Sequence, residues 1–139
     1  MRIGMLTSGG DCQSLNAAMR GVAKTLYNNT KDIEIYGFLD GYKGMITKNY
    51  KLMKEEDFSG ILTEGGTILG TSRTPFKYIN EPDEGGRDKV ASMIKTYKDL
   101  KLDCLVVLGG NGSHKTAALL SQKGLNVVTL PKTIDNDIE

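Results

Sequence analysis

The sequence predicts an α/β fold in which a doubly wound, mostly parallel sheet carries helices on both faces, as in Rossmann-like proteins. Three observations lead to this prediction. Short apolar runs alternate along the chain with segments of helical periodicity. A strand, helix, strand order favours parallel pairing, because a crossover helix returns the chain to the same edge of the sheet. Glycines also gather directly after two of the apolar runs, where open parallel sheets bind their ligands.

The predicted strands are short apolar runs. Residues 3–6, 104–108 and 127–130 are continuously apolar or nearly so, which is typical of strands buried on both faces. Residues 33–38 alternate between apolar and polar side chains at their start, and we expect a less buried strand there.

Helical spacing of apolar residues fills the segments between these strands. Residues 15–26 carry one apolar face after the first glycine turn, and residues 90–100 carry another before the strand at 104–108. Residues 117–120 predict a shorter helix after the second glycine turn. Each of these helices is therefore expected to be a crossover between parallel strands.

Residues 47–87 are less regular and hold two of the three prolines. We expect short strands and loops over one end of the sheet in this segment. No repeat and no Ser- or Pro-rich linker divides the chain, so we expect a single domain. The chain stops a few residues after its last predicted strand, and we interpret this end as a truncation.

Composition excludes several classes of protein. The 18 basic and 17 acidic residues leave a net charge of +1, which offers no basic surface for nucleic acid and no polybasic patch for membranes. We find neither a signal peptide nor an apolar run long enough to span a membrane. Cys12 and Cys104 lack the spacing of a zinc site, even with His114. We therefore expect a reduced, cytoplasmic protein.

Glycine accounts for 17 of the 139 residues, about 12% against a typical share of about 7%. The glycines are not spread as in a linker, but cluster at residues 9–10, 65–70 and 109–112. Because glycine allows the backbone to approach another molecule closely, these clusters predict ligand contacts.

The first motif, directly after the first predicted strand, is Thr7-Ser8-Gly9-Gly10-Asp11, and Asn16 follows in the next helix. Its glycines let backbone N–H groups turn toward an anion at a helix start, where the helix dipole favours negative charge. An ordinary strand-to-helix turn uses the same residues, and for this motif alone both interpretations stay open.

The second motif spans residues 65–75 and includes Gly65-Gly66, Gly70 and Arg73-Thr74. A guanidinium group forms forked hydrogen bonds with phosphate better than an ammonium group does. A solitary arginine is more often a solvated surface charge, but the glycines around Arg73 weaken that alternative.

The third motif is Leu108-Gly109-Gly110-Asn111-Gly112-Ser113-His114-Lys115. Backbone amides of such a run can cradle a polyphosphate. It is not a dinucleotide fingerprint, because Lys115 stands at the third glycine position, and it lacks the glycine that precedes the lysine of a Walker loop. We expect His114 to be a surface residue at a helix start rather than a ligand or a base.

The fourth motif, after the last predicted strand, is Pro131-Lys132-Thr133-Ile134-Asp135-Asn136-Asp137. Its two carboxylates and lysine could bind a metal–phosphate complex or accept a proton from a hydroxyl group. A polar turn is the commoner meaning of such residues.

Together the four segments resemble the 6-phosphofructokinase family. Its members carry Thr-Ser-Gly-Gly-Asp, Gly-Gly-Thr-x-Leu-Gly-x-x-Arg, Gly-Gly-x-Gly-Ser/Thr and Thr-Ile-Asp-Asn-Asp in this order, and all four occur here across essentially the whole chain. Because family members are much longer, the resemblance implies that residues 1–139 are the N-terminal, phosphoryl-donor-binding domain. The implied fold is that of the family's large domain, with the rest of the enzyme absent.

The resemblance also implies residue roles. Asp135 would be the general base for transfer of a phosphoryl group to the 1-hydroxyl of fructose 6-phosphate, giving fructose 1,6-bisphosphate in glycolysis. Lys132, Thr133 and Asp137 would bind this substrate, and Mg²⁺ would bridge the donor phosphates. The full enzyme would be a cytoplasmic, allosteric homo-oligomer, and we expect the isolated fragment to be inactive. The positions that match the ATP-binding residues are Gly10, Arg73, Thr74, Gly110, Asn111, Gly112 and Ser113.

Two departures from the family pattern matter. Many members carry Asp where Asn111 stands, and a neutral amide lacks the charge that hard cations prefer, so Asn111 is a weak candidate ligand for magnesium. Cys12-Gln13-Ser14 replaces the Ala-Pro-Gly of the best-known bacterial members, which indicates a side branch. Arg20 and Lys24 lie where some bacterial members bind an effector nucleotide, but we expect a solvated helix face there.

Two residues point to different phosphoryl donors. Gly112 is typical of ATP users, because the Asp usual in pyrophosphate users would fill the space of the next phosphate and repel it. Lys132 is typical of pyrophosphate users, but a lysine can neutralise charge on either donor. A blocking carboxylate excludes a donor whereas a lysine permits both, so we expect ATP, with pyrophosphate as the alternative.

Two other functions remain as alternatives. An NAD kinase-like enzyme also pairs a glycine-rich loop with a parallel sheet, but it would not account for residues 133–137 or for the loop around Arg73. A nucleotide-binding regulatory module could keep the loops and lose catalysis. The presence of both Asp135 and Arg73 argues against that module.

Overall fold

The structure is a computed structural model that describes residues 1–8, 12–29, 32–54, 79–82, 85–109 and 111–131. Within these ranges, the surroundings of the side chains are described for all residues except 12–18, 111–113 and 131.

A single five-stranded sheet, in the order β3-β2-β1-β4-β5, forms the centre of the molecule. Strand β1 pairs in parallel with β2 and β4, β4 pairs in parallel with β5, and β3 alone runs antiparallel, beside β2. The predicted doubly wound, mostly parallel sheet is therefore confirmed, with one antiparallel strand at its edge. The strands are β1 (Arg2–Ser8), β2 (Glu34–Phe38), β3 (Tyr50–Met53), β4 (Cys104–Gly109) and β5 (Val127–Pro131).

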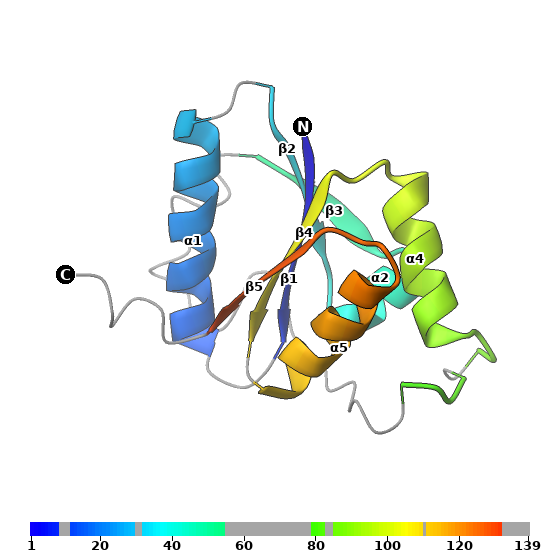
Figure 1. Ribbon diagram of the computed structural model, residues 1–139. Coiled ribbons are helices and arrows are strands. Elements are labelled where there is room, and N and C mark those ends of the chain that lie inside the picture. The colour runs from blue at the N-terminus through cyan, green and yellow to red at the C-terminus, as the bar shows by residue number, and fades with distance from the viewer. Residues whose placement is uncertain (9–11, 30–31, 55–78, 83–84, 110, 132–139) are drawn as a thin grey trace.

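Helices cover both faces of the sheet, as Figure 1 shows. Helix α1 (Cys12–Asn29) packs on one face, where Met19 and Ala23 join a buried cluster with Met5 of β1. Helices α2 (Tyr42–Thr47), α4 (Lys89–Asp99) and α5 (Asn111–Gln122) cover the other face. The predicted helices at 15–26, 90–100 and 117–120 are confirmed, and α5 begins earlier than its apolar residues indicated.

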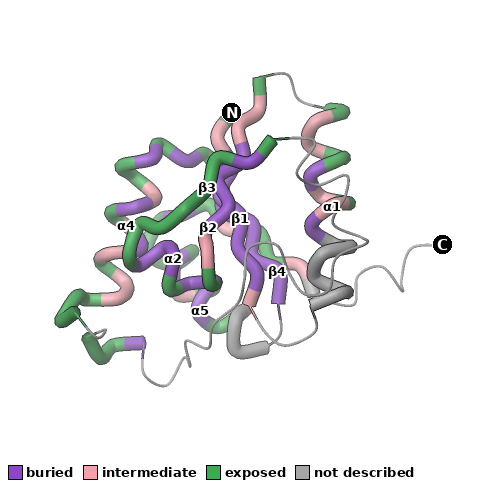
Figure 2. The backbone as a smooth tube through the Cα atoms, turned by 180° about the vertical axis from the view of Figure 1, so that it is seen from behind, coloured by how far each residue is buried: buried purple, intermediate pink, exposed green. Residues whose placement is uncertain are grey.

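The central strands are buried on both faces because helices lie above and below them. Figure 2 shows buried residues along β1 and β4, whereas three of the four residues of the edge strand β3 are exposed. The expectation of a less buried strand at residues 33–38 is wrong for most of β2, since residues 35–38 are all buried. The reason is its position: β2 lies between β1 and β3 and beneath α2.

The turn between β2 and β3 forms a short helix that the sequence did not predict. Gly41 precedes α2 with φ of 65°, a conformation that favours glycine. A Cβ atom at Gly44 would collide with the backbone of Leu39 and lie 2.8 Å from the carbonyl oxygen of Asn49. Helix α2 can therefore lie against its own flanking backbone only because residue 44 has no side chain.

Helix α4 is capped and is bound to α2. The Asp88 side chain accepts a hydrogen bond of 3.0 Å from the backbone N–H of Ala91, which stabilises the start of the helix. The buried hydroxyl of Thr96 donates to the carbonyl oxygen of Met45 at 2.8 Å. This second bond holds α2 against α4 on the face of the sheet opposite to α1.

Candidate functional site

The order of the strands creates one position where a ligand can enter the edge of the sheet. From β1 the chain crosses to β2 on one side, and from β4 it crosses to β5 on the other side. The winding direction thus reverses between the neighbouring strands β1 and β4. In open α/β sheets, ligands bind outside the carboxyl ends of the strands at such a reversal.

The carboxyl ends of three parallel strands meet at this edge. Ser8 at the end of β1 is in register with Gly109 at the end of β4, and Gly109 is in register with Pro131 at the end of β5. These three residues belong to the first, third and fourth sequence motifs. The structure therefore confirms the predicted strands before these motifs and places the beginnings of all three motifs side by side.

Two helices begin next to the same reversal. Helix α1 starts at Cys12 shortly after β1, and α5 starts at Asn111 shortly after β4. Figure 1 shows the two helices rising from the same end of the sheet on its opposite faces. The first N–H groups of a helix have no partner within the helix and carry partial positive charge, so both starts favour an anion. This arrangement suits a polyphosphate.

The predicted site residues divide between described and undescribed parts of the chain. Asn111, Gly112 and Ser113 form the first turn of α5, although their side-chain surroundings are not described. The predicted site residues that lie outside the described residues are Gly10, Arg73, Thr74, Gly110, Lys132, Thr133, Asp135 and Asp137.

Helix α5 also holds two polar side chains that the sequence did not single out as a pair. His114 is half-buried and its Nε2 atom is buried, while Thr116 is 0% exposed. Neither His114 Nε2 nor Thr116 Oγ1 has a hydrogen-bond partner in the described structure. The expectation that His114 lies at a helix start is confirmed, since it is the fourth residue of α5. The expectation of a surface residue holds only in part, because its Nε2 atom is buried. In the sequence, the polar Thr116 directly before the apolar residues 117–120 was the signal that a polar side chain lies on the buried face of this helix.

The described residues contain no group of three side chains with His, Cys, Asp or Glu chemistry that could hold a metal ion. Asn111, the candidate magnesium ligand, stands at the first position of α5. Cys104 lies at the amino end of β4, the strand before α5. Burial raises the pKa of its thiol and keeps it protonated. A reactive thiolate at Cys104 is thus disfavoured.

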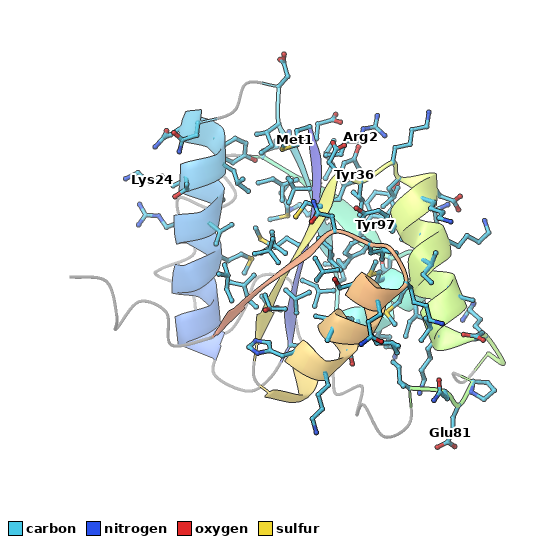
Figure 3. All side chains as sticks on the ribbon, viewed as in Figure 1. Met1, Arg2, Lys24, Tyr36, Glu81 and Tyr97 are labelled. Atoms are coloured by element: carbon cyan, nitrogen blue, oxygen red, sulfur yellow. The ribbon has the colours of Figure 1, made fainter. Side chains whose placement is uncertain are left out.

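The amino end of the sheet is chemically different from the carboxyl end. The Arg2 guanidinium donates to the Glu34 carboxylate at 3.1 Å and to the carbonyl oxygen of Leu100 at 2.9 Å. Figure 3 shows Arg2 and Tyr36 at the end of the sheet away from the helix starts of α1 and α5, and Lys24 pointing outward from α1. These contacts join β1 to β2 and to the turn after α4, so Arg2 has a structural role.

None of the helices in the described part of the chain is long and apolar enough to cross a membrane.

Comparison with known proteins identifies the family. The family model for phosphofructokinase matches residues 2–139. An ATP-dependent 6-phosphofructokinase of Spirochaeta thermophila is 58% identical in an alignment that covers 97% of this chain. ATP-dependent 6-phosphofructokinase 3 of Bacteroides thetaiotaomicron is 47% identical over 99% of this chain. The chain spans only 37% and 40% of these two relatives, respectively.

A solved structure supports the fold. The phosphofructokinase from Saccharomyces cerevisiae matches with a TM-score of 0.77 and 30% sequence identity. The match covers 98% of this chain and 20% of the yeast chain. The sheet and its helices are therefore those of a phosphofructokinase structure, over a part of the larger chain.

Proposed function

Since the chain belongs to the phosphofructokinase family, we propose that it is the phosphoryl-donor-binding portion of an ATP-dependent 6-phosphofructokinase. The complete enzyme transfers a phosphoryl group from ATP to the 1-hydroxyl of fructose 6-phosphate, giving fructose 1,6-bisphosphate in glycolysis. The observation that carries the proposal is the reversal between β1 and β4. There the ends of both strands and the starts of α1 and α5 meet, which favours binding of a polyphosphate.

The donor in this proposal lies along the starts of α1 and α5. Gly10 and Gly110 follow β1 and β4 in the sequence, and Gly112 and Ser113 belong to the first turn of α5. Their backbone N–H groups would donate hydrogen bonds to phosphate oxygens, and Arg73 and Thr74 would contact the transferred group. The absence of a side chain at Gly112 leaves space for the third phosphate of ATP, which favours ATP over pyrophosphate.

The acceptor in this proposal is bound by the segment after β5. Lys132, Thr133 and Asp137 would hold fructose 6-phosphate next to the donor, because β5 ends at Pro131 beside Gly109. The Asp135 carboxylate takes the proton of the 1-hydroxyl while that oxygen attacks the terminal phosphorus and ADP leaves. Arg73 and the backbone amides stabilise the negative charge on the group in transfer.

Magnesium belongs to this proposal as the partner of ATP. Asn111 occupies the first position of α5, and its amide oxygen would bind the ion or one of its waters. Asn111 would be a weak ligand, because it lacks the charge that hard cations prefer, but Mg²⁺ keeps several waters and is bound largely by substrate phosphates. When bound, Mg²⁺ would neutralise charge on the donor phosphates.

We further propose that the complete enzyme is a cytoplasmic homo-oligomer under allosteric control, and that residues 1–139 alone are inactive. Phosphoryl transfer depends on positioning and electrostatic stabilisation, and the chain has only four arginines, at positions 2, 20, 73 and 87. Turnover by the purified 139-residue chain would contradict its proposed inactivity. Light scattering on the full-length enzyme tests whether it is a homo-oligomer.

The test of the function is an assay of the full-length enzyme with fructose 6-phosphate, in which ATP and pyrophosphate are offered separately. We expect formation of fructose 1,6-bisphosphate with ATP and at least tenfold lower kcat/KM with pyrophosphate. Turnover with pyrophosphate alone would leave the acceptor correct and the donor wrong. No turnover with either donor would contradict the proposed function.

A further inference from the structure

The two unpartnered polar atoms of α5 require an explanation. Buried polar side-chain atoms are nearly always hydrogen-bonded, and exceptions often mark a site that a ligand or water completes. Within the part of the chain that the structure describes, only His114 Nε2 and Thr116 Oγ1 are buried without a partner. Both atoms belong to the first two turns of the same helix, which begins at the reversal between β1 and β4.

The position of His114 in the helix gives its side chain a direction. Side chains on an α-helix lean toward the helix N-terminus, so each covers the turn before its own Cα atom. His114 is the fourth residue of α5, and the turn before it is the glycine-rich start of the helix. The imidazole is therefore expected to lean toward the turn where the donor phosphates are proposed to bind.

The unpartnered nitrogen is costly in the protein without a ligand. The ring of His114 is only half-buried, so rotation about its side-chain bonds can bring Nε2 to a molecule bound at the helix start. A phosphate oxygen would then provide the partner that Nε2 lacks, and a hydrogen bond to a charged acceptor is stronger than one between neutral groups.

We propose that His114 is a donor-binding residue whose Nε2–H donates a hydrogen bond to a phosphate oxygen of the phosphoryl donor. The inference rests on the proposed function, because it takes the donor site to be the start of α5. It adds a side-chain contact to the backbone N–H groups at the start of α5.

The test uses the full-length enzyme with ATP and fructose 6-phosphate and compares three substitutions of one residue. His114→Phe keeps a ring but removes both nitrogens. His114→Gln places an amide nitrogen near the position of Nε2, whereas His114→Asn places it near the position of Nδ1. Lys115→Ala, at an exposed neighbouring residue, is the matched control for a general change at this turn. Binding of the ATP analogue AMP-PNP is measured for each variant by calorimetry.

We expect His114→Phe to raise the KM for ATP about tenfold to a hundredfold, the usual effect of losing a hydrogen bond to a charged group. The KM for fructose 6-phosphate should stay within about twofold. His114→Gln should restore the ATP KM to within about threefold of wild type, and His114→Asn should not. Lys115→Ala should change it by less than about threefold.

A folded His114→Phe enzyme with the wild-type KM for ATP would overturn the proposal and indicate that Nε2 only holds an internal water. Equal effects of His114→Gln and His114→Asn would overturn it as well, and this comparison decides the matter if His114→Phe does not fold. If wild type lacks turnover with either donor, the proposed function fails on its own. The affinities for AMP-PNP and pyrophosphate then decide whether His114 binds a donor: unchanged affinities in the variants overturn the inference.

Discussion

The two ends of the central sheet differ in how completely their polar groups are paired. At the amino end, the Arg2 side chain contacts Glu34 and the carbonyl oxygen of Leu100, and its backbone N–H donates to the Asp103 carboxylate at 2.8 Å. At the carboxyl end, two helices begin on opposite faces of the sheet, and His114 Nε2 is buried without a partner in the described structure. Arg2 thus finds its partners within the protein, whereas His114 Nε2 has hydrogen-bonding capacity left for a ligand.

This difference separates stability from function along the same strands. Each of the parallel strands β1 and β4 has a paired start and an end at which a glycine motif begins. Substitutions at the amino end should therefore change the stability of the protein with little effect on turnover. Substitutions at the carboxyl end should change turnover with little effect on stability.

The largest expected effect is at Asp135, in the segment that follows β5. In the full-length enzyme, Asp135→Asn should lower kcat about a hundredfold to ten-thousandfold, because removing a general base typically has this cost. Donor affinity, measured by calorimetry with AMP-PNP, should stay nearly unchanged. A kcat within threefold of wild type would show that Asp135 is not the base.

A smaller but selective effect is expected at Gly112 in the first turn of α5. Two unit charges about 4 Å apart interact by roughly 4 kcal/mol at an effective dielectric near 20. Gly112→Asp should accordingly lower kcat/KM for ATP by about two powers of ten or more, and affect pyrophosphate far less. Gly112→Ala is the matched control, since it adds a carbon without a charge. Equal losses for both donors would contradict the steric and charge argument.

At the amino end, Arg2→Met should affect stability alone. The substitution keeps most of the aliphatic chain and removes the bonds to Glu34 and Leu100. The ion pair is partly exposed, so we expect a loss of about 1 kcal/mol and a fall of a few degrees in Tm. The kcat of the full-length enzyme should be unchanged. A severalfold loss of kcat without a change in Tm would abolish the distinction between the two ends.

The smallest effect concerns pH and the end of α4. Hydrogen bonds from Lys95 and Lys48 hold the pKa of Asp99 below its ordinary value of 3.8. Because the pKa is lower in the folded protein, these two ion pairs stabilise the fold above about pH 4. Their contribution disappears as pH falls through the folded pKa. Asp99→Asn should therefore lower Tm slightly at pH 7 and not at all at the lowest pH where both proteins fold. A difference that grows on acidification would contradict this sign.

The strands and longer helices could be predicted because their signals are local. Residues 104–108 form a continuous apolar run, and the apolar face of α1 repeats with helical spacing over several turns. Helix α2 could not be predicted in this way, since it is only six residues long. It depends on the contact of Gly44 with the backbone of Leu39 and Asn49, which exists only after the turn has folded.

The candidate site was predictable as a set of motifs but not as an arrangement. Glycines after two strands indicated a phosphate-binding edge, but the pairing of Ser8 with Gly109 joins residues far apart in the sequence. The buried nitrogen of His114 depends in turn on how α5 packs against β4 and β5. Spacing along the chain shows neither that Ser8 pairs with Gly109 nor that His114 Nε2 is buried. The second motif and residues 132–137 lie outside the described residues, and their roles remain predictions.

The most direct test of the difference between the two ends is amide hydrogen exchange of the full-length enzyme with and without AMP-PNP. Binding of the donor at the reversal between β1 and β4 should slow exchange in peptides covering residues 8–16 and 109–116. Exchange in peptides covering residues 32–34 and 100–104, at the amino end, should not change. Protection at the amino end without protection at the start of α5 would contradict the account.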